Sequence, residues 1–484
     1  MSSHTSLIQS LQTALGATHI LTEGDLTTYE RDWRGLVRGR ALAVALPGNV
    51  DEVAAVVRAC ADHGVSIVPQ GGNTGLALGS VPDASATQVV LSLRRMNHVR
   101  TLDRANLTMT VEAGCILQTL QQTAQEAGFL FPLSLAAKGS CTIGGNLATN
   151  AGGTQVVHYG NTRALCLGLE VVTAEGAVWN GLSGLRKDNT GYDLRDLFVG
   201  SEGTLGVITA ATLRIHPLPK ARRVAWAAVP DLDAALKLLD LAHHTLGPGL
   251  TGFEVMSQFA LTLVDRYFPQ LRVPMYRTSP WCVLIEHSDH ESEEHARAQL
   301  ESLLQHALES GAATDAIVAE NLAQSDNLWH MRESISMAQA KEGVNVKHDI
   351  SIPIARIPAF VAETDALLAR AIPGVRLVDF GHLGDGNLHY NVQAPEGVDA
   401  VAFLQAESKH INQVVFDAVA RYDGSISAEH GIGSFKADLL PHYKSPVAMA
   451  LMRRIKRALD PDNRMNPGRV LTTGSEAAGR RTGQ

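Results

Sequence analysis

Three glycine-rich segments constrain the fold of this chain more than any other feature. They are residues 71–75 (Gly-Gly-Asn-Thr-Gly), residues 139–153 and residues 200–206 (Gly-Ser-Glu-Gly-Thr-Leu-Gly). Glycine lets a ligand approach the main chain closely and leaves backbone N–H groups free to bind an anion. Each segment alone could simply form a turn. Together they indicate one large ligand, containing a diphosphate, that many loops contact.

The common nucleotide-binding motifs do not account for these segments. A Rossmann GxGxxG motif opens a helix, whereas residues 200–206 run into a β-rich stretch. A P-loop is excluded because the sequence contains no Gly-Lys-Ser or Gly-Lys-Thr. The diphosphate is therefore expected in a fold of another kind.

Hydrophobic periodicity predicts mixed α and β structure in two large parts. In the first part we expect strands at 41–46, 65–68 and 108–113, helices at 51–63 and 116–127, and a hairpin at 169–179. The proline-rich stretch at 216–219 is the predicted first boundary. Beyond it, strands at 224–229, 281–286 and 346–352 alternate with helices at 231–246, 291–310 and 357–371. This order is typical of an α+β domain with an antiparallel sheet.

The predicted domain organisation follows from these boundaries. Residues 1–219 form the ligand-binding domain, and residues 220–425 form the α+β domain. A C-terminal segment, residues 426–472, consists of small-residue loops and closes the site. Residues 473–484 are polar and small, so we expect a disordered tail.

Composition excludes several classes of function. The 484 residues are 45% hydrophobic, which is ample for real cores, and the net charge of -8 argues against nucleic acid as a partner. The five cysteines contain no CxxC pair, so we expect reduced core thiols. No apolar run of about 18 residues and no signal peptide occurs, which predicts a cytoplasmic protein without a membrane span.

A metal site is predicted from two short motifs. In residues 382–389, Asp385-Gly386 favours a two-residue hairpin turn, which would place His382 directly opposite His389. Side chains so paired have Cβ atoms about 4.5–5.5 Å apart, which lets two imidazoles bind one ion. Glu429 could add an oxygen ligand, and this set suits zinc, with manganese or cobalt as alternatives. The competing interpretation is a polar turn and an unrelated helix cap.

His430 follows Glu429 and is the predicted catalytic base, because histidine is the side chain that most often transfers protons in enzymes. A fourth metal ligand, or a residue that orients the ligands, is the alternative role. If His430 is the base, its replacement by alanine should nearly abolish turnover while metal content stays intact.

A carboxylate-binding group is predicted further upstream. Residues 328–336 are expected to be helical, which puts Arg332 and Ser336 one turn apart on one face, with Lys347 on the next strand. A guanidinium, a hydroxyl and an ammonium suit a substrate carboxylate. Alternatively, Arg332 could pair with Glu333 or Glu320, and Lys347 could be a solvated strand residue.

Several longer motifs resemble a known family. Residues 69–76, 131–134, 139–146, 149–153 and 200–206 resemble the FAD-binding domain of the vanillyl-alcohol-oxidase-type flavoproteins. Arg332-Glu333 and residues 381–389, 428–431 and 465–468 are similar to its D-2-hydroxyacid dehydrogenase branch, which includes enzymes acting on D-2-hydroxyglutarate, D-lactate and glycolate. Residues 183–194 favour the hydroxyglutarate subgroup.

The resemblance implies a two-subdomain FAD-binding domain, an α+β substrate (cap) domain, and a C-terminal segment that returns to the FAD. It implies that the following residues line the flavin: Pro69, Gly71, Gly72, Asn73, Thr74, Gly75, Leu76, Ser134, Gly139, Ser140, Thr142, Gly145, Asn146, Asn150, Glu202, Gly203, Ile208 and Asn466. Relatives that bind flavin covalently often have histidine where this chain has Asn73, so we expect non-covalent FAD.

The resemblance also implies the reaction. We expect oxidation of D-2-hydroxyglutarate, or a related acid such as D-malate, to the 2-keto acid by hydride transfer to flavin. The trio Arg332, Ser336 and Lys347 would contact the distal carboxylate, and Asn391 would also face the substrate. The acceptor would be an electron-transfer flavoprotein or a quinone, and a homodimer is the default assembly.

Three alternatives remain open. A D-lactate or glycolate dehydrogenase would need no group for a second carboxylate. A flavin-dependent alkyl transferase would perform no net redox chemistry. A zinc hydrolase without flavin would leave the glycine-rich segments without a purpose.

Overall fold

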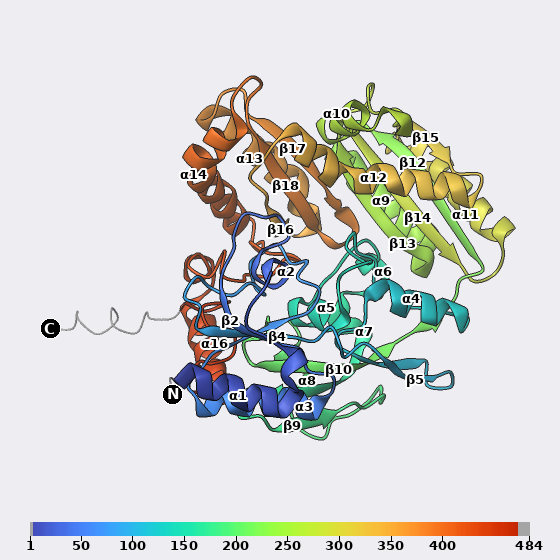
Figure 1. Ribbon diagram of the computed structural model, residues 1–484. Coiled ribbons are helices and arrows are strands. Elements are labelled where there is room, and N and C mark those ends of the chain that lie inside the picture. Colours follow the sequence, from blue (N-terminus) through green and yellow to red (C-terminus); the bar gives the residue numbers. More distant parts are fainter. Residues whose placement is uncertain (1–2, 473–484) are drawn as a thin grey trace.

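The computed structural model describes residues 3–472, so the predicted tail at 473–484 lies outside the described residues. A four-stranded, a five-stranded and a two-stranded sheet belong to the lower half of the molecule in Figure 1, and a seven-stranded sheet occupies the upper half. Within the described residues, no helix is long and apolar enough to cross a membrane. The five cysteines are buried and unpaired, as the absence of a CxxC motif predicts.

The lower half contains a mixed sheet, in which β1 is antiparallel to β2 and the other pairs are parallel, and an antiparallel sheet. The first has the order β1-β2-β4-β3, with β1 (Ile20–Leu21), β2 (Ala41–Ala45), β4 (Gln88–Ser92) and β3 (Ile67–Gln70). All five residues of β4 are buried, as expected for a central parallel strand that is covered on both faces. The second has the order β5-β6-β10-β8-β9, with β5 (Val99–Asp103), β6 (Thr108–Glu112), β10 (Gly206–Arg214), β8 (Cys166–Thr173) and β9 (Val178–Gly181).

Several helices accompany these sheets, and one of them, α6, packs on the large upper sheet. They are α1 (Ser3–Leu15), α2 (Thr27–Glu30), α3 (Val50–Asp62), α4 (Leu117–Glu126), α5 (Ile143–Thr149), α6 (Val156–Tyr159), α7 (Thr162–Leu165) and α8 (Arg195–Phe198). Helix α3 begins where Asn49 accepts the Glu52 N–H, and it buries a stripe of Val53, Val56, Val57 and Cys60. The second glycine-rich segment is not a loop throughout, because residues 143–149 form α5.

The upper half is one seven-stranded antiparallel sheet, which confirms the predicted α+β class. Its order is β15-β12-β14-β13-β17-β18-β16, with β15 (Asp315–Val318), β12 (Ala221–Val229), β14 (Trp281–Asp289), β13 (Leu250–Ser257), β17 (Arg376–His382), β18 (Asn387–Gln393) and β16 (Asp349–Ser351). One face packs on α9 (Leu232–Leu246), α11 (Glu293–Glu309), α13 (Ile357–Ala371) and α14 (Ala400–Arg421). The other face packs on α10 (Gln258–Tyr267) and α12 (Leu322–Glu342).

The chain between the two halves is not a free hinge. Strand β11 (His216–Pro217) pairs with β7 (Phe129–Leu130), so the proline-rich stretch is tied to the lower half. The chain then enters β12 directly.

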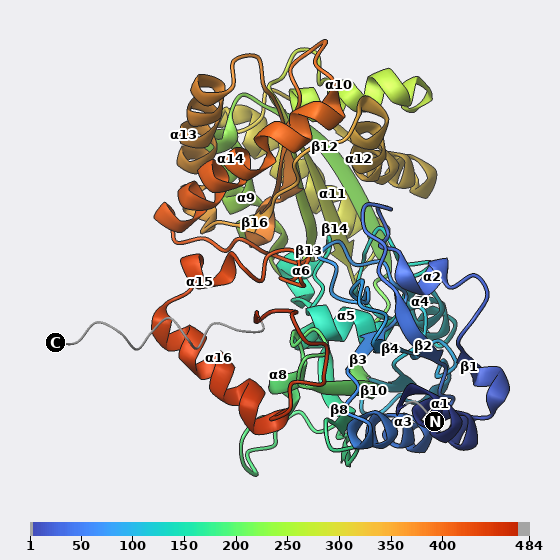
Figure 2. The ribbon, with the colours of Figure 1, turned by 60° about the vertical axis from the view of Figure 1, so that its left-hand side comes forward.

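The C-terminal segment returns to the lower half, where Asn466 donates its backbone N–H to the Ile67 carbonyl at 2.8 Å. The expectation of loops alone is wrong here, because the segment contains α15 (Leu440–Tyr443) and α16 (Pro446–Leu459), which lie along the outside in Figure 2. Ser445 and Pro446 are a normal helix start, since Ser445 accepts the Ala448 N–H.

The predicted register of the histidine hairpin is also wrong. His382 lies opposite Asn387, and His389 lies opposite Phe380. A 3₁₀ turn at Leu383–Asp385, followed by Gly386 at φ 84°, makes the connection longer than two residues. The pairing is shifted by two residues, which keeps both imidazoles on one face of the sheet.

Candidate active site

The glycine-rich segments meet around a cleft of about 930 Å³ in the lower half of the molecule. Of the residues predicted to line the flavin, those in this cleft are Pro69, Gly71, Gly72, Asn73, Thr74, Gly75, Thr142, Gly145, Asn146, Glu202, Gly203 and Ile208. Leu76, Ser134, Gly139, Ser140, Asn150 and Asn466 do not line it. Residues that the sequence did not single out, such as Gln70, Ser80 and Val207, do.

Asn466 lies one layer behind the cleft. Its Nδ2 donates to the carbonyls of Gly79 at 2.8 Å and Glu202 at 2.7 Å. The Glu202 carboxylate accepts the N–H groups of Ile432 and Gly433, each at 2.7 Å. The C-terminal segment therefore closes against the loops that form the cleft.

The lining of the cleft fits a large polar ligand such as FAD. A Cβ on Gly72 would stand 2.1 Å from the Ser140 carbonyl oxygen, so only glycine fits this close approach of two loops. Three buried lining atoms, Gln70 Oε1, Thr142 Oγ1 and Asn146 Oδ1, have no hydrogen-bond partner among the described residues. Unmatched buried polar groups are costly, which indicates that a ligand satisfies them.

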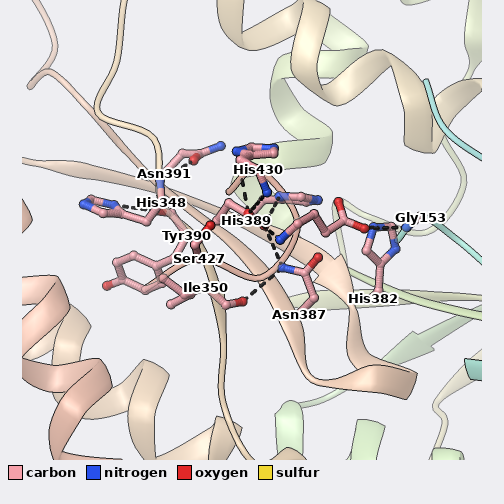
Figure 3. Close-up of polar contacts among 12 residues, drawn as sticks. Gly153, His348, Ile350, His382, Asn387, His389, Tyr390, Asn391, Ser427 and His430 are labelled. Carbon is pink, nitrogen blue, oxygen red and sulfur yellow. Dashed lines mark hydrogen bonds and ion pairs between the residues drawn. The ribbon is translucent and has the colours of Figure 1, made fainter. Parts of the chain in front are cut away.

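The three predicted metal ligands come together above the cleft. Donor atoms of His382, His389 and Glu429 all lie within 4.8 Å of one another. The two imidazole centres are 5.4 Å apart, and His382 Nε2 lies 3.9 Å from Glu429 Oε1. The same Glu429 oxygen accepts the Gly153 N–H, which links this group to the second glycine-rich segment (Figure 3). The residues present fit a divalent metal with two imidazoles and one carboxylate.

Asp349 is a site residue that the sequence analysis missed. It lies 1% exposed on β16, and its Oδ2 accepts the N–H groups of Glu429 and His430, each at 2.8 Å. Its Oδ1 accepts from Asn387 Nδ2 at 3.0 Å. The donor atoms of Asp349, His389 and His430 also lie within 4.8 Å of one another. Because both Asp349 oxygens already accept hydrogen bonds, we interpret it as the residue that holds the His430 loop.

His430 connects the metal group to the cleft. Its Nδ1 lies 3.7 Å from Asp349 Oδ2, and the residue also lines the cleft of the glycine-rich segments. Its ring is stacked 6.2 Å from that of His389. A base at this position would stand between the two candidate cofactor sites.

Glu254, on β13, is the second residue that the sequence analysis missed. It is 0% exposed, accepts from His382 Nδ1 at 2.6 Å, and accepts from Arg332 Nε at 2.8 Å. Burial opposes the positive charge of His382, but the Glu254 carboxylate outweighs burial and raises the pKa of His382 to about 9. An acidic residue within the apolar run of residues 250–256 is the signal that could have revealed it.

The predicted carboxylate-binding residues are only partly assembled. Arg332 lies on α12 as expected and is buried, but it pairs with Glu254 instead of Glu333 or Glu320. Ser336 is exposed one turn further along the helix. Lys347 has no hydrogen bond or ion pair with the described residues, and burial together with the charge of Arg34 lowers its pKa to about 8.

Asn391 lies on β18, on the same face as His389, and is buried. Its Oδ1 accepts the His348 N–H at 3.2 Å and its Nδ2 donates to Gln339 at 3.0 Å. Both ends of the amide are therefore engaged within the protein.

Family models match both halves of the chain. A model for the FAD binding domain matches residues 41–181, and a model for FAD linked oxidases, C-terminal domain, matches residues 218–470. A D-2-hydroxyglutarate dehydrogenase of Xanthomonas citri pv. viticola is 40% identical over 467 residues, which cover 96% of this chain and 97% of that protein. The mitochondrial D-2-hydroxyglutarate dehydrogenase of Bos taurus is 41% identical over 443 residues, covering 91% and 79%.

Solved structures agree on the fold. A substrate-bound p-cresol methylhydroxylase superposes with a TM-score of 0.79 at 17% identity, covering 98% of both chains. An alkyldihydroxyacetonephosphate synthase superposes with a TM-score of 0.70 at 17% identity, covering 96% of this chain and 84% of that one. The fold is therefore of the vanillyl-alcohol-oxidase type, and the protein is an FAD-dependent oxidoreductase. The chain belongs to the FAD-linked oxidase family and to its D-2-hydroxyacid dehydrogenase branch.

Proposed function

We propose that this protein oxidises D-2-hydroxyglutarate to the 2-keto acid, using non-covalent FAD and a divalent metal, with zinc the best fit. One observation carries the proposal: His382, His389 and Glu429 converge next to His430, which itself lines the glycine-rich cleft. The names of the similar bacterial and mitochondrial relatives support this substrate.

Each part of the site has one task in this reaction. When bound, FAD supplies a hydride acceptor, and the metal supplies a Lewis acid that polarises the hydroxyl and one carboxylate oxygen. His382, His389 and Glu429 would hold the metal, and the C1 carboxylate and hydroxyl are the substrate groups that would face these residues. His430 takes the hydroxyl proton while the α-hydrogen leaves as hydride. Asp349 holds His430 in place through the backbone N–H.

The proposed substrate class is a dicarboxylate, and the residues that would bind its second carboxylate, distal to the hydroxyl, support this choice. Lys347 is a partly buried cation without a protein partner among the described residues, which favours an anionic ligand beside it. Arg332 contributes less than expected, because Glu254 already accepts from its Nε. A dicarboxylate is therefore favoured over D-lactate or glycolate.

A substrate panel tests the proposal. Initial rates of the purified flavoprotein would be measured with D-2-hydroxyglutarate, D-malate, D-lactate and glycolate, with a dye as acceptor, before and after chelator treatment. We expect the highest kcat/KM with D-2-hydroxyglutarate and recovery of activity on adding zinc, manganese or cobalt. Equal rates with D-lactate would contradict the dicarboxylate, and chelator-resistant activity would contradict the metal.

The second candidate is a flavin-dependent alkyl transferase without net redox chemistry. It is favoured only by the fold shared with the alkyldihydroxyacetonephosphate synthase. Anaerobic bleaching of the flavin by a D-2-hydroxy acid would exclude it. The proposed physiological acceptor is an electron-transfer flavoprotein or a quinone, which reoxidation rates would distinguish.

A further inference from the structure

We infer that Glu254 is a positioning residue that sets the tautomer of His382 for metal binding. The same carboxylate also orients Arg332. The inference rests on the proposed metal-dependent function. Glu254 lies on β13, directly opposite His382 of β17 in the sheet, and its side chain is completely buried. Because the side chain is buried, neither carboxylate oxygen can accept a hydrogen bond from solvent, and both accept from protein donors.

The first oxygen acts on His382. Oε1 accepts from His382 Nδ1 at 2.6 Å, so Nδ1 carries the proton. The other ring nitrogen, Nε2, is then the one that a metal can bind by displacing its proton, and it is the nitrogen that faces Glu429, at 3.9 Å. A carboxylate that accepts from the far nitrogen of a ligating imidazole fixes its ring orientation and raises its basicity as a ligand.

The second oxygen acts on Arg332. Oε2 accepts from Arg332 Nε at 2.8 Å, while the guanidinium lies 4.8 Å from the centre of the Phe380 ring. One carboxylate therefore orients a residue of the metal group and a residue predicted to bind the distal end of the substrate. Loss of this carboxylate would leave two buried donors without their acceptor.

Replacing Glu254 with glutamine separates positioning from simple packing, because the side chain keeps its shape. With the amide oxygen toward Arg332, the amide NH₂ faces His382 Nδ1, which can accept only if Nε2 carries the proton. A protonated Nε2 cannot bind a metal. If the amide is flipped, its oxygen faces His382 and its NH₂ faces the N–H groups of Arg332, so that two donors meet without an acceptor. Neither arrangement satisfies both neighbours.

Glu286 provides a matched control on the adjacent strand. It is 2% exposed on β14, and its two oxygens accept from Trp329 Nε1 at 2.9 Å and Thr251 Oγ1 at 3.0 Å. Glu286→Gln therefore disturbs an equally buried carboxylate of the same sheet without touching His382. Both variants should lose stability, but only Glu254→Gln should lose metal.

The experiment measures zinc affinity by chelator competition, with bound zinc determined by elemental analysis in flavin-loaded wild type, Glu254→Gln and Glu286→Gln. We expect about 10- to 100-fold weaker zinc binding in Glu254→Gln and unchanged binding in Glu286→Gln. Equal affinity in all three would overturn the role of Glu254. If the wild type binds no zinc, the metal-dependent function has failed first, and this inference falls with it.

A second measurement does not need a Glu254 variant. In zinc-loaded wild type labelled with ¹⁵N-histidine, the ring signals missing from His382→Gln identify His382. We expect a protonated Nδ1 and a zinc-bound Nε2. Zinc bound through Nδ1 would overturn the inference even if Glu254→Gln does not fold.

Discussion

Asp349 and His430 are linked twice: Asp349 Oδ2 accepts the His430 backbone N–H at 2.8 Å and lies 3.7 Å from His430 Nδ1. The same oxygen accepts the neighbouring Glu429 N–H, so one buried carboxylate holds the turn that carries both residues. The position of the predicted base therefore depends on a strand about eighty residues upstream.

Asp349→Asn should destabilise the protein by about 1–3 kcal/mol, because an amide cannot accept from both sides as the carboxylate does. Its NH₂ would face either two backbone N–H groups or Asn387 Nδ2. Urea unfolding checks the loss. In the double variant Asp349→Asn/Asn387→Asp, the new asparagine can donate to the new aspartate. This restores one hydrogen bond between the two positions and should recover part of the stability. An unchanged unfolding midpoint in the single variant would contradict this role.

His430→Gln should lower kcat by about 10²–10⁴-fold, since a general base contributes a factor of this size. Bound metal should stay at the wild-type level, because His382, His389 and Glu429 remain. Steady-state kinetics and elemental analysis of the same preparation test this prediction. His389→Gln is the control and should lose metal and activity together. If His430→Gln also loses metal, His430 is a ligand.

Lys347→Met should lower kcat/KM for D-2-hydroxyglutarate by roughly 10- to 100-fold, because a hydrogen bond to a charged group contributes about 1.5–3 kcal/mol. The rate with D-lactate, which lacks a second carboxylate, should change little. The ratio of the two kcat/KM values is the readout. An equal fall of kcat/KM with both substrates would mean that Lys347 does not bind the distal carboxylate.

Gly72→Ala and Gly75→Ala should behave differently, although both residues line the cleft. A Cβ at Gly72 meets the Ser140 carbonyl oxygen at 2.1 Å, whereas a Cβ at Gly75 meets no protein atom within 4 Å. Gly72→Ala should therefore lower the melting temperature of flavin-free protein, and Gly75→Ala should leave it unchanged. Flavin titration should reveal weaker FAD binding in Gly75→Ala if the ligand lies against this loop. Equal melting temperatures for both variants would contradict the crowding at Gly72.

Asp379→Asn should stabilise the protein at high pH. Asp379 is 3% exposed, and burial together with the charge of Asp365 raises its pKa well above the ordinary value. A raised folded pKa gives stability that is complete below the unfolded pKa of about 3.9 and is lost as pH rises through the folded pKa. Asparagine does not titrate, so the variant does not lose this stability as pH rises.

Melting temperatures between pH 4 and pH 9 test the Asp379 prediction. The curves of wild type and Asp379→Asn should diverge as pH rises, with the variant melting at the higher temperature at the upper end. The exposed Asp240→Asn on α9 is the control, and its curve should run parallel to the wild type. Divergence toward low pH instead would contradict the raised pKa.

Much of this protein could be predicted from the sequence, because the relevant signals are local. The helix at residues 357–371 and the buried stripe of α3 follow from hydrophobic spacing over about four turns each. The glycines of residues 71–75 and the residue types His382, His389, Glu429 and His430 are read directly from short motifs. Even with the wrong hairpin register, the two imidazoles remain on one face, since the error was an even number of residues.

Only the tertiary structure decided how these residues are held. Glu254 reaches His382 across 128 positions of the chain, and Asp349 reaches His430 across 81. The hydrogen-bond partner of a single acidic residue in a strand cannot be predicted from the residues around it, because strands distant in sequence become neighbours only when the sheet forms. Burial then obliges each carboxylate to accept hydrogen bonds from whatever donors the fold brings to it. The sequence determined which candidate groups for flavin, metal and carboxylate binding the chain carries, and the packing of the sheet decided which acids contact them.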